Sequence, residues 1–169
     1  MATFVLTVLG DDRPGLVSAL SATITAHGAS WERSQLAQLA GKFAGIVVVR
    51  VPDDRHDALV AELAALEGLQ VATERSERVV TGETSFFLLE LLGDDRPGIV
   101  AEISSALAEA GVSIEELTTD VREAPHAGGM LFEARALLDV PAGATQDDVQ
   151  AVLEGLADEL MVELRLSEQ

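Results

Sequence analysis

One seven-residue phrase, Leu-Gly-Asp-Asp-Arg-Pro-Gly, carries the residues whose types and spacing suggest chemistry. It occurs twice without a change, at positions 9–15 and 92–98. Each copy follows an apolar run and precedes residues with helical spacing, so it is expected to end a strand and open a helix. The free backbone N–H groups at such a helix start favour an anion such as an α-carboxylate. Gly15 and Gly98 would let the backbone approach a ligand closely.

The paired aspartates of the phrase narrow the kind of ligand. Carboxylates would repel a phosphate, so the phrase is not a phosphate cradle. They would accept a hydrogen bond from a ligand ammonium or tie the loop to its own amides. A small zwitterion therefore fits the turn, and the alternative is a turn that only joins a strand to a helix. Pro14 and Pro97 would fix the entry of the chain into the turn, and Pro14 is predicted at the first helical position, where a missing N–H is no loss.

The similarity between the two copies extends far beyond the phrase. Residues 15–17 match residues 98–100, and Gly28 to Ser30 match Gly111 to Ser113, all at an offset of 83. Later matches have an offset of 89, so the second copy carries six extra residues, predicted in a longer hairpin loop around 123–129. The chain is thus expected to hold two copies of one unit.

Periodicity gives each unit the order β-α-β-β-α-β. The predicted domains are 1–78 and 84–169, with a linker at about 76–83. In the first, Gly28 and Gly68 are expected to end the two helices, and Asp53 or Asp54 to cap the second. In the second, strands are expected near 87–89, 112–121, 130–140 and 160–166, and helices at 99–110 and 145–158. The predicted fold class is α+β, with two ferredoxin-like units whose antiparallel sheets carry both helices on one face.

The inventory for catalysis is poor. The chain has no Cys and no Tyr, and its three histidines are His27, His56 and His126. His27 is expected to complement the dipole at a helix C-terminus. His56 is expected in a solvated first helical turn, since no second histidine lies at metal-ligand spacing, and His126 has no evident partner. No Gly-x-Ser-x-Gly motif occurs. We therefore predict no enzyme, no catalytic residue, no metal and no cofactor.

Charge and hydropathy limit the partners and the location. The formal charge is −18, of which residues 82–169 carry −15. This argues against direct binding to nucleic acid, and the acidic half is either a solvated surface or a face for a basic partner. The N-terminus has no basic region typical of a signal peptide, and no apolar run is long enough to span a membrane. A cytoplasmic protein without membrane contact is expected.

The unit resembles a known regulatory module. The β-α-β-β-α-β order, Asp-Arg-Pro-Gly at the first turn, and Gly-x-Ser-Trp or Gly-x-Ser-Ile opening the second strand resemble the ACT domain, which binds amino acids. Two such units filling the chain resemble the glycine cleavage system transcriptional repressor group of tandem ACT proteins. Residues 9–17 and 30–43 are similar to the first unit of that group.

The resemblance implies where a ligand would be held. ACT ligands typically lie at the interface between two units, between the turn after strand one and the start of strand two. The matching residues are Asp12, Arg13, Pro14, Gly15, Gly28 and Ser30, with Asp95, Arg96, Pro97, Gly98, Gly111 and Ser113. The family often has Asn where this chain has Ser30 and Ser113, and Ser offers only one short hydroxyl. The difference indicates another ligand, a water-bridged contact or a unit kept for assembly.

Two classes of function follow. The first is an amino-acid-binding regulator of amino-acid (glycine) metabolism or transcription, with glycine or serine as the first candidate ligands and a protein partner such as a transcription regulator. The alternative is a ligand-independent dimerisation or docking module, or a regulatory subunit of a separate enzyme. The second strand is expected at a sheet edge, which would allow pairing in a homodimer. Trp31 on that strand is expected in the core or at the dimer contact.

Overall fold

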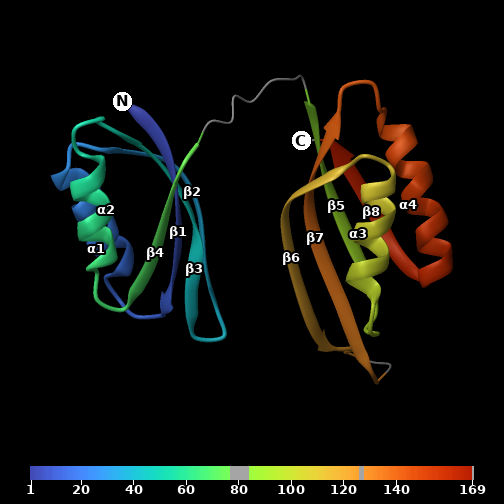
Figure 1. Ribbon diagram of the computed structural model, residues 1–169. Helices are drawn as coiled ribbons and strands as arrows, with labels where there is room; N and C mark the ends of the chain where they lie inside the picture. The colour runs from blue at the N-terminus through green and yellow to red at the C-terminus, as the bar shows by residue number, and fades with distance from the viewer. Residues whose placement is uncertain (77–83, 126–127, 169) are drawn as a thin grey trace. The chain divides into compact units, whose positions relative to one another are not determined.

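The computed structural model describes residues 1–76, 84–125 and 128–168. The chain divides into two compact units, Met1–Val79 and Val80–Gln169 (Figure 1). Most of the predicted linker at 76–83, and His126 in the predicted insertion, lie outside the described residues. Within the described ranges, no helix is long and apolar enough to cross a membrane.

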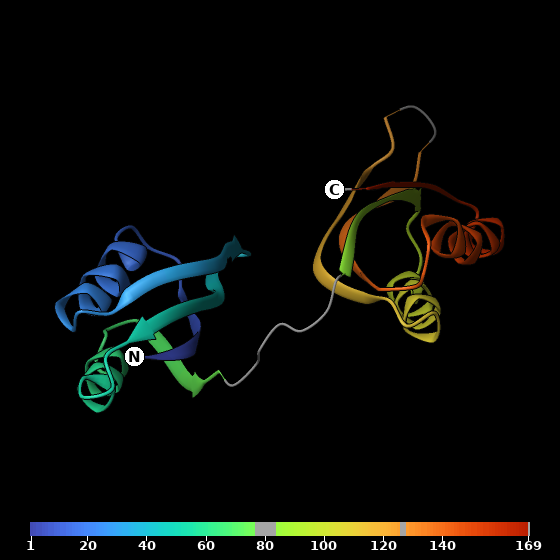
Figure 2. The same cartoon turned by 90° about the horizontal axis from the view of Figure 1, so that it is seen from above.

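The first unit has four strands and two helices in the predicted order. They are β1 (Ala2–Asp11), α1 (Leu16–Ala26), β2 (Ser30–Leu39), β3 (Lys42–Val51), α2 (His56–Ala64) and β4 (Leu69–Arg75). The sheet order is β2-β3-β1-β4, and every neighbouring pair is antiparallel. Both helices cover the same face of the sheet (Figure 2). This is the predicted ferredoxin-like fold, with β2 at one sheet edge.

The core of the first unit follows from two periodicities. In β1 every second side chain points toward the helices, and Phe4, Leu6 and Val8 are buried. On α1, Leu20 and Ile24 lie one turn apart and are buried in the same layer. Burying one Leu or Ile side chain away from water stabilises the folded state by about 1.5–3 kcal/mol. The buried side chains of β1 and α1 therefore fix the end of β1 and the start of α1, and the first turn joins these two ends.

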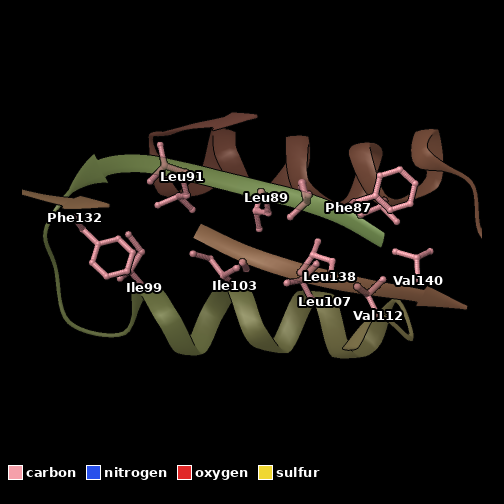
Figure 3. Close-up of a cluster of buried hydrophobic side chains, with 14 residues drawn as sticks. Phe87, Leu89, Leu91, Ile99, Ile103, Leu107, Val112, Phe132, Leu138 and Val140 are labelled. Atoms are coloured by element: carbon pink, nitrogen blue, oxygen red, sulfur yellow. The ribbon is translucent and has the colours of Figure 1, made fainter. Parts of the chain in front are cut away.

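The second unit repeats this architecture. Its elements are β5 (Thr84–Asp94), α3 (Ile99–Glu109), β6 (Ser113–Glu123), β7 (Met130–Pro141), α4 (Gln146–Leu160) and β8 (Val162–Glu168). The antiparallel sheet has the order β6-β7-β5-β8. Figure 3 shows Leu89 and Leu91 of β5 facing Ile103 and Leu107 of α3, all buried. Because α4 continues through Leu160, the last strand begins two residues later than predicted.

The start of α1 corrects one sequence prediction, whereas α3 begins at Ile99 as predicted. The N-cap residues are Gly15 and Gly98, so Pro14 precedes the N-cap and does not occupy the first helical position. The glycines have φ of +93° and +92°. This left-handed conformation, which glycine adopts without a Cβ penalty, delays each helix by two residues after the proline.

The second helix of the first unit is shorter than predicted. Its N-cap is Arg55, with no side-chain cap, and it ends at Ala64, so Gly68 does not end it. The predicted capping role of Asp53 or Asp54 is wrong. Asp53 instead accepts a hydrogen bond from the N-terminal ammonium of the chain at 2.8 Å, and Gly68 has φ of +79° in the connection to β4.

The two central hairpins differ in length, as the repeat offset predicts. β2 and β3 are joined by Ala40 and Gly41, with φ of +49° and +79°. Positive φ at both positions matches the right-handed twist of the strands in a two-residue hairpin. β6 ends at Glu123 and β7 begins at Met130, which leaves room for a longer loop at this end of the second sheet.

Candidate ligand-binding turns

The first Asp-Asp-Arg-Pro-Gly turn joins β1 to α1 beside the β2–β3 hairpin. The amide of Asp12 donates to the carbonyl of Gly41 at 2.9 Å, and the amide of Ala19 donates to the carbonyl of Gly15 at 2.9 Å. No side chain caps α1, and its first turn has no acidic residue. A Cβ on Gly15 would meet no heavy atom within 4 Å. The start of α1 therefore presents uncapped amides beside open space.

Arg13 anchors the first turn to the connection between α2 and β4. Its Nη2 donates to the carbonyl of Glu67, and a Cβ on Gly68 would lie only 3.0 Å from Nη2. Among the described residues, no carboxylate pairs with Arg13. The guanidinium is held in place by a neutral carbonyl, so its positive charge stays available at the turn.

The second turn has the same backbone but different side-chain contacts. The amide of Asp95 donates to the carbonyl of Met130 at 2.8 Å, and the amide of Glu102 donates to the carbonyl of Gly98 at 3.0 Å. Arg96 makes a bidentate pair with Glu102, from Nη1 at 2.9 Å and from Nη2 at 2.7 Å. Hydrogen bonding from Arg96 lowers the pKa of the Glu102 carboxyl below its ordinary value. This arginine therefore already holds a carboxylate.

The aspartates do not tie the turns to their own amides. Among the described residues, the carboxylates of Asp12 and Asp95 accept no hydrogen bond. Asp11 instead pairs with Lys42, which lowers the pKa of the Asp11 carboxyl. Of the two roles predicted for the paired aspartates, the intramolecular one is thus not observed, and Asp12 is exposed beside the uncapped start of α1.

Gly28 and Gly111 have a structural role at the ends of α1 and α3. Their φ values are +66° and +73°. The amide of Gly28 donates to the carbonyl of Thr25 at 2.9 Å, and that of Gly111 donates to the carbonyl of Ala108 at 3.0 Å. The following amide reaches the carbonyl five residues before it in both units. These paired bonds are a Schellman motif, which confirms the predicted C-cap glycine.

Ser30 lies at the opposite end of its unit from the Gly15 turn. In the sheet, Ser30 is opposite Arg50 and Leu39 is opposite Lys42, which in turn faces Asp11. The length of α1 separates the two positions, and its 11 residues span about 16 Å. That distance is far longer than a glycine or serine molecule. One small ligand cannot contact both Ser30 and the Gly15 turn of the same unit.

The second unit separates its predicted residues in the same way. Ser113 is opposite Asp139 at one end of the sheet, and Asp94, which precedes the second turn, is opposite Leu131 at the other end. Gly111 lies with Ser113 at the far end of α3 from Gly98. In each unit, the four predicted turn residues (12–15 or 95–98) therefore lie together. The predicted glycine and serine near the start of the second strand lie away from them.

A hollow of about 640 Å³ adjoins the first turn. Leu9, Asp11, Lys42, Gly68 and Gln70 are among its lining residues. Its lining comes from the end of β1, the start of β3, the α2–β4 connection and the start of β4. Sequence reasoning missed the contributions of Lys42 and of the α2–β4 connection, because both are distant in sequence from the repeated phrase.

The histidines make contacts that differ from those expected. His27 Nε2 lies 2.7 Å from Glu62 Oε2, so it links the C-terminal end of α1 to α2. The His56 ring stacks on Phe4, with ring centroids 4.1 Å apart, and its Nδ1 lies 3.0 Å from Asp57. His56 is thus the first residue of α2 as predicted, but part of its ring is covered. Among the described residues, no group of three potential ligands could hold a metal ion.

Trp31 lies on the edge strand β2 and packs against the core of the first unit. It is half-buried and contacts the cluster that contains Phe4, Leu20 and Val49. The ladder between β2 and β3 is irregular directly after it, between Trp31 and Arg33. The predicted core contact is therefore present.

Both units match a known family. The model of the ACT domain covers residues 2–74 and 85–167, so the chain belongs to the ACT-domain family. The two ferredoxin-like sheets with their helices are the fold of a tandem pair of such domains. ACT domains are regulatory, and the chain is an ACT-domain regulatory protein.

Individual proteins resemble this chain in sequence or in fold. A protein of unknown function from Galdieria sulphuraria is 32% identical, with a TM-score of 0.88 over 99% of this chain and 98% of its own. A protein provisionally assigned as a glycine cleavage system transcriptional repressor shares the fold, with 17% identity and a TM-score of 0.72 over 99% and 97%. A UPF0237 protein of Methanopyrus kandleri is 36% identical over 76 residues, or 45% of this chain and 83% of that protein.

Proposed function

We propose that this protein binds a small amino acid at the Gly15 turn and regulates amino-acid metabolism or transcription through a protein partner. The observation that carries the proposal is the uncapped start of α1, which lies beside open space and the Arg13 guanidinium. The ACT family and the similarity to a protein assigned as a glycine cleavage repressor support glycine or serine as the first candidates.

Each group of the turn has a separate role in this proposal. The ligand carboxylate would accept hydrogen bonds from amides of the first turn of α1, where the helix dipole favours an anion. Arg13 adds a positive charge, and the exposed Asp12 carboxylate would accept a hydrogen bond from the ligand ammonium. Gly15 leaves the space for this contact because it has no side chain. Binding would favour whichever assembly state holds the ligand more tightly.

A second copy of the chain would complete the site. Ser30 and Gly28 lie too far from the Gly15 turn of their own unit to contact the same ligand. The edge strand β2 exposes backbone groups that could pair with a partner strand. A homodimer would bring the second-strand start of one copy to the turn of the other. Since the formal charge is −18, an effect on transcription would be transmitted by a basic protein partner and not by direct contact with DNA.

Isothermal titration calorimetry with the full-length protein tests the binding. Glycine and serine are expected to bind, while acetate, which lacks the ammonium, and glycinamide, which lacks the carboxylate, are expected to bind at least tenfold more weakly. The remaining amino acids define the selectivity. Absence of binding by all twenty at millimolar concentration would exclude the proposal.

The alternative is a ligand-independent docking module or a regulatory subunit of a separate enzyme. The observation that favours it is that all four motif glycines have positive φ, so turn and cap geometry alone requires glycine there. This alternative predicts an oligomer whose mass by light scattering does not change with any amino acid. An oligomer that changes size or stability on addition of glycine or serine would contradict it.

A further inference from the structure

We infer that the two Asp-Arg-Pro-Gly turns are not equivalent: Glu102 closes the second turn, and the first turn alone takes the ligand carboxylate. This inference rests on the proposed function, since it assigns that function to one of two copies. The seven residues are identical in the two turns, so the difference must come from the residues around them.

The backbone of the two turns is the same. Gly15 has φ of +93° and ψ of −2°, and Gly98 has φ of +92° and ψ of −8°. Each turn is fastened to the neighbouring hairpin by the amide of its second aspartate, at 2.9 Å and 2.8 Å. Both helices lack a side-chain cap. Backbone geometry therefore gives neither turn an advantage.

The arginines have opposite surroundings. Arg13 donates to the neutral carbonyl of Glu67, and no carboxylate among the described residues neutralises it. Arg96 is in a bidentate ion pair with Glu102, the geometry in which a guanidinium binds carboxylate most tightly. A ligand at the second turn would have to displace an internal carboxylate, and a ligand at the first turn would not.

Glu102 also occupies the approach to the second turn. It lies in the first turn of α3, and its Oε1 is 3.5 Å from the position of a Cβ on Gly98. The helix dipole and Arg96 both hold the negative charge at that place. A second carboxylate beside it would be repelled. The equivalent position in the first unit is Ala19, which carries no charge and leaves Gly15 open.

The exchange of these two residues tests the assignment. Calorimetry with glycine and serine is expected to give one site per chain for the natural sequence. Ala19→Glu, at an exposed helix position, is expected to weaken binding at least tenfold, because it brings a carboxylate within reach of Arg13. Glu102→Ala and the near-isosteric Glu102→Gln are expected to raise the stoichiometry to two sites per chain.

Glycine amide resonances in a ¹⁵N-correlated NMR spectrum locate the binding directly. Addition of ligand to the natural protein is expected to shift the Gly15 signal and leave the Gly98 signal in place, while in Glu102→Gln both should move. Far-UV circular dichroism checks that the variants fold. Two sites in the natural protein, or unchanged binding by Ala19→Glu, would overturn the inference and leave the proposed function standing. No binding by the natural protein or any variant would overturn both.

Discussion

The outer faces of the two sheets differ more than their cores do. In the first sheet, Thr7 of β1 lies opposite Ile46 of β3, and Ile46 is 49% exposed. At the equivalent place in the second sheet, Glu90 of β5 lies opposite Arg135 of β7, and their side chains form an ion pair at 2.7 Å. Buried positions of both sheets stay apolar because the helices exclude water from them. The outer positions have no such constraint, so the same place on the fold holds an uncharged pair in the first sheet and an ion pair in the second.

A change at the end of β1 or β5 is expected to have the largest effect. Gly10 and Gly93 are the equivalent glycines of the repeated phrase. A Cβ on Gly10 would lie 2.2 Å from the carbonyl oxygen of Gly68, which is backbone, while a Cβ on Gly93 would lie 2.4 Å from Cγ1 of Val162. Gly10→Ala is expected to destabilise its unit by about 3 kcal/mol, and Gly93→Ala by about 1–2 kcal/mol, because a side chain yields more readily than backbone.

Urea denaturation followed by Trp31 fluorescence reports on the first unit, since Trp31 is the chain's single tryptophan. Amide hydrogen exchange reports on the second unit. Equal losses of unfolding free energy in the two variants would contradict this prediction. They would show that the Gly68 backbone and the Val162 side chain move aside equally easily.

Substitutions at the N-caps of α2 and α4 are expected to have an intermediate effect on stability. Thr145 accepts a hydrogen bond from the amide of Asp148, whose carboxylate accepts one from the amide of Thr145. The N-cap of α2, Arg55, makes no side-chain cap. Thr145→Ala is expected to cost about 1 kcal/mol, and Arg55→Ala less than about 0.5 kcal/mol. Thermal denaturation of both variants provides the comparison, and a larger loss for Arg55→Ala would contradict it.

The charged outer face should contribute little to stability. Arg135 is mostly exposed, so water and salt screen its pair with Glu90. Glu90→Gln is expected to reduce the free energy of unfolding by less than about 1 kcal/mol at low salt, and by less still at high salt. The matched control is Thr7→Val at the equivalent uncharged position of the first sheet, whose effect should not depend on salt. A salt-independent loss in Glu90→Gln would show that packing, and not charge, links the two strands.

The smallest effect concerns the acid dependence of the second unit. Hydrogen bonding from Arg96 lowers the pKa of the Glu102 carboxyl below the ordinary value for a glutamate. A carboxyl whose folded pKa is depressed contributes stability above the unfolded pKa, and this contribution disappears as the pH falls through the folded pKa. Glu102→Gln is therefore expected to flatten the loss of stability below pH 4.5 in the second unit. Hydrogen exchange at several pH values measures it, and an unchanged slope would contradict the role of the pair.

The repeat and the two periodicities were sufficient to predict the fold. Identical phrases at positions 9–15 and 92–98 marked equivalent turns, and the strand and helix periodicities gave the order of the elements. The start of α1 was predicted two residues early because proline favours the first helical position. The left-handed glycine after it decided the start instead, and sequence alone does not show that a glycine has positive φ.

The candidate site was predicted in parts. The turns were found from the phrase, but the partners of Arg13 and Arg96 were not, because a long side chain can reach several elements. A signal for one of them exists in the sequence, since the offset of 83 places Glu102 opposite Ala19. The order of elements also implies that the helix separates Ser30 from the Gly15 turn. The family pattern alone, without the strand register, groups these residues together.

The ion pair between Glu90 and Arg135 has a consequence for how the chain folds during synthesis. Two central strands that lead into the same seven-residue phrase can compete for the same place in a sheet. If β5 took the place of β1, Glu90 would lie opposite Ile46, and its charge would lose the partner that Arg135 provides. A mismatched charge of this kind disfavours the wrong partner. The pair is therefore expected to disfavour an exchange of central strands between the two halves, and misassembly of this kind is a characteristic failure of repeat proteins.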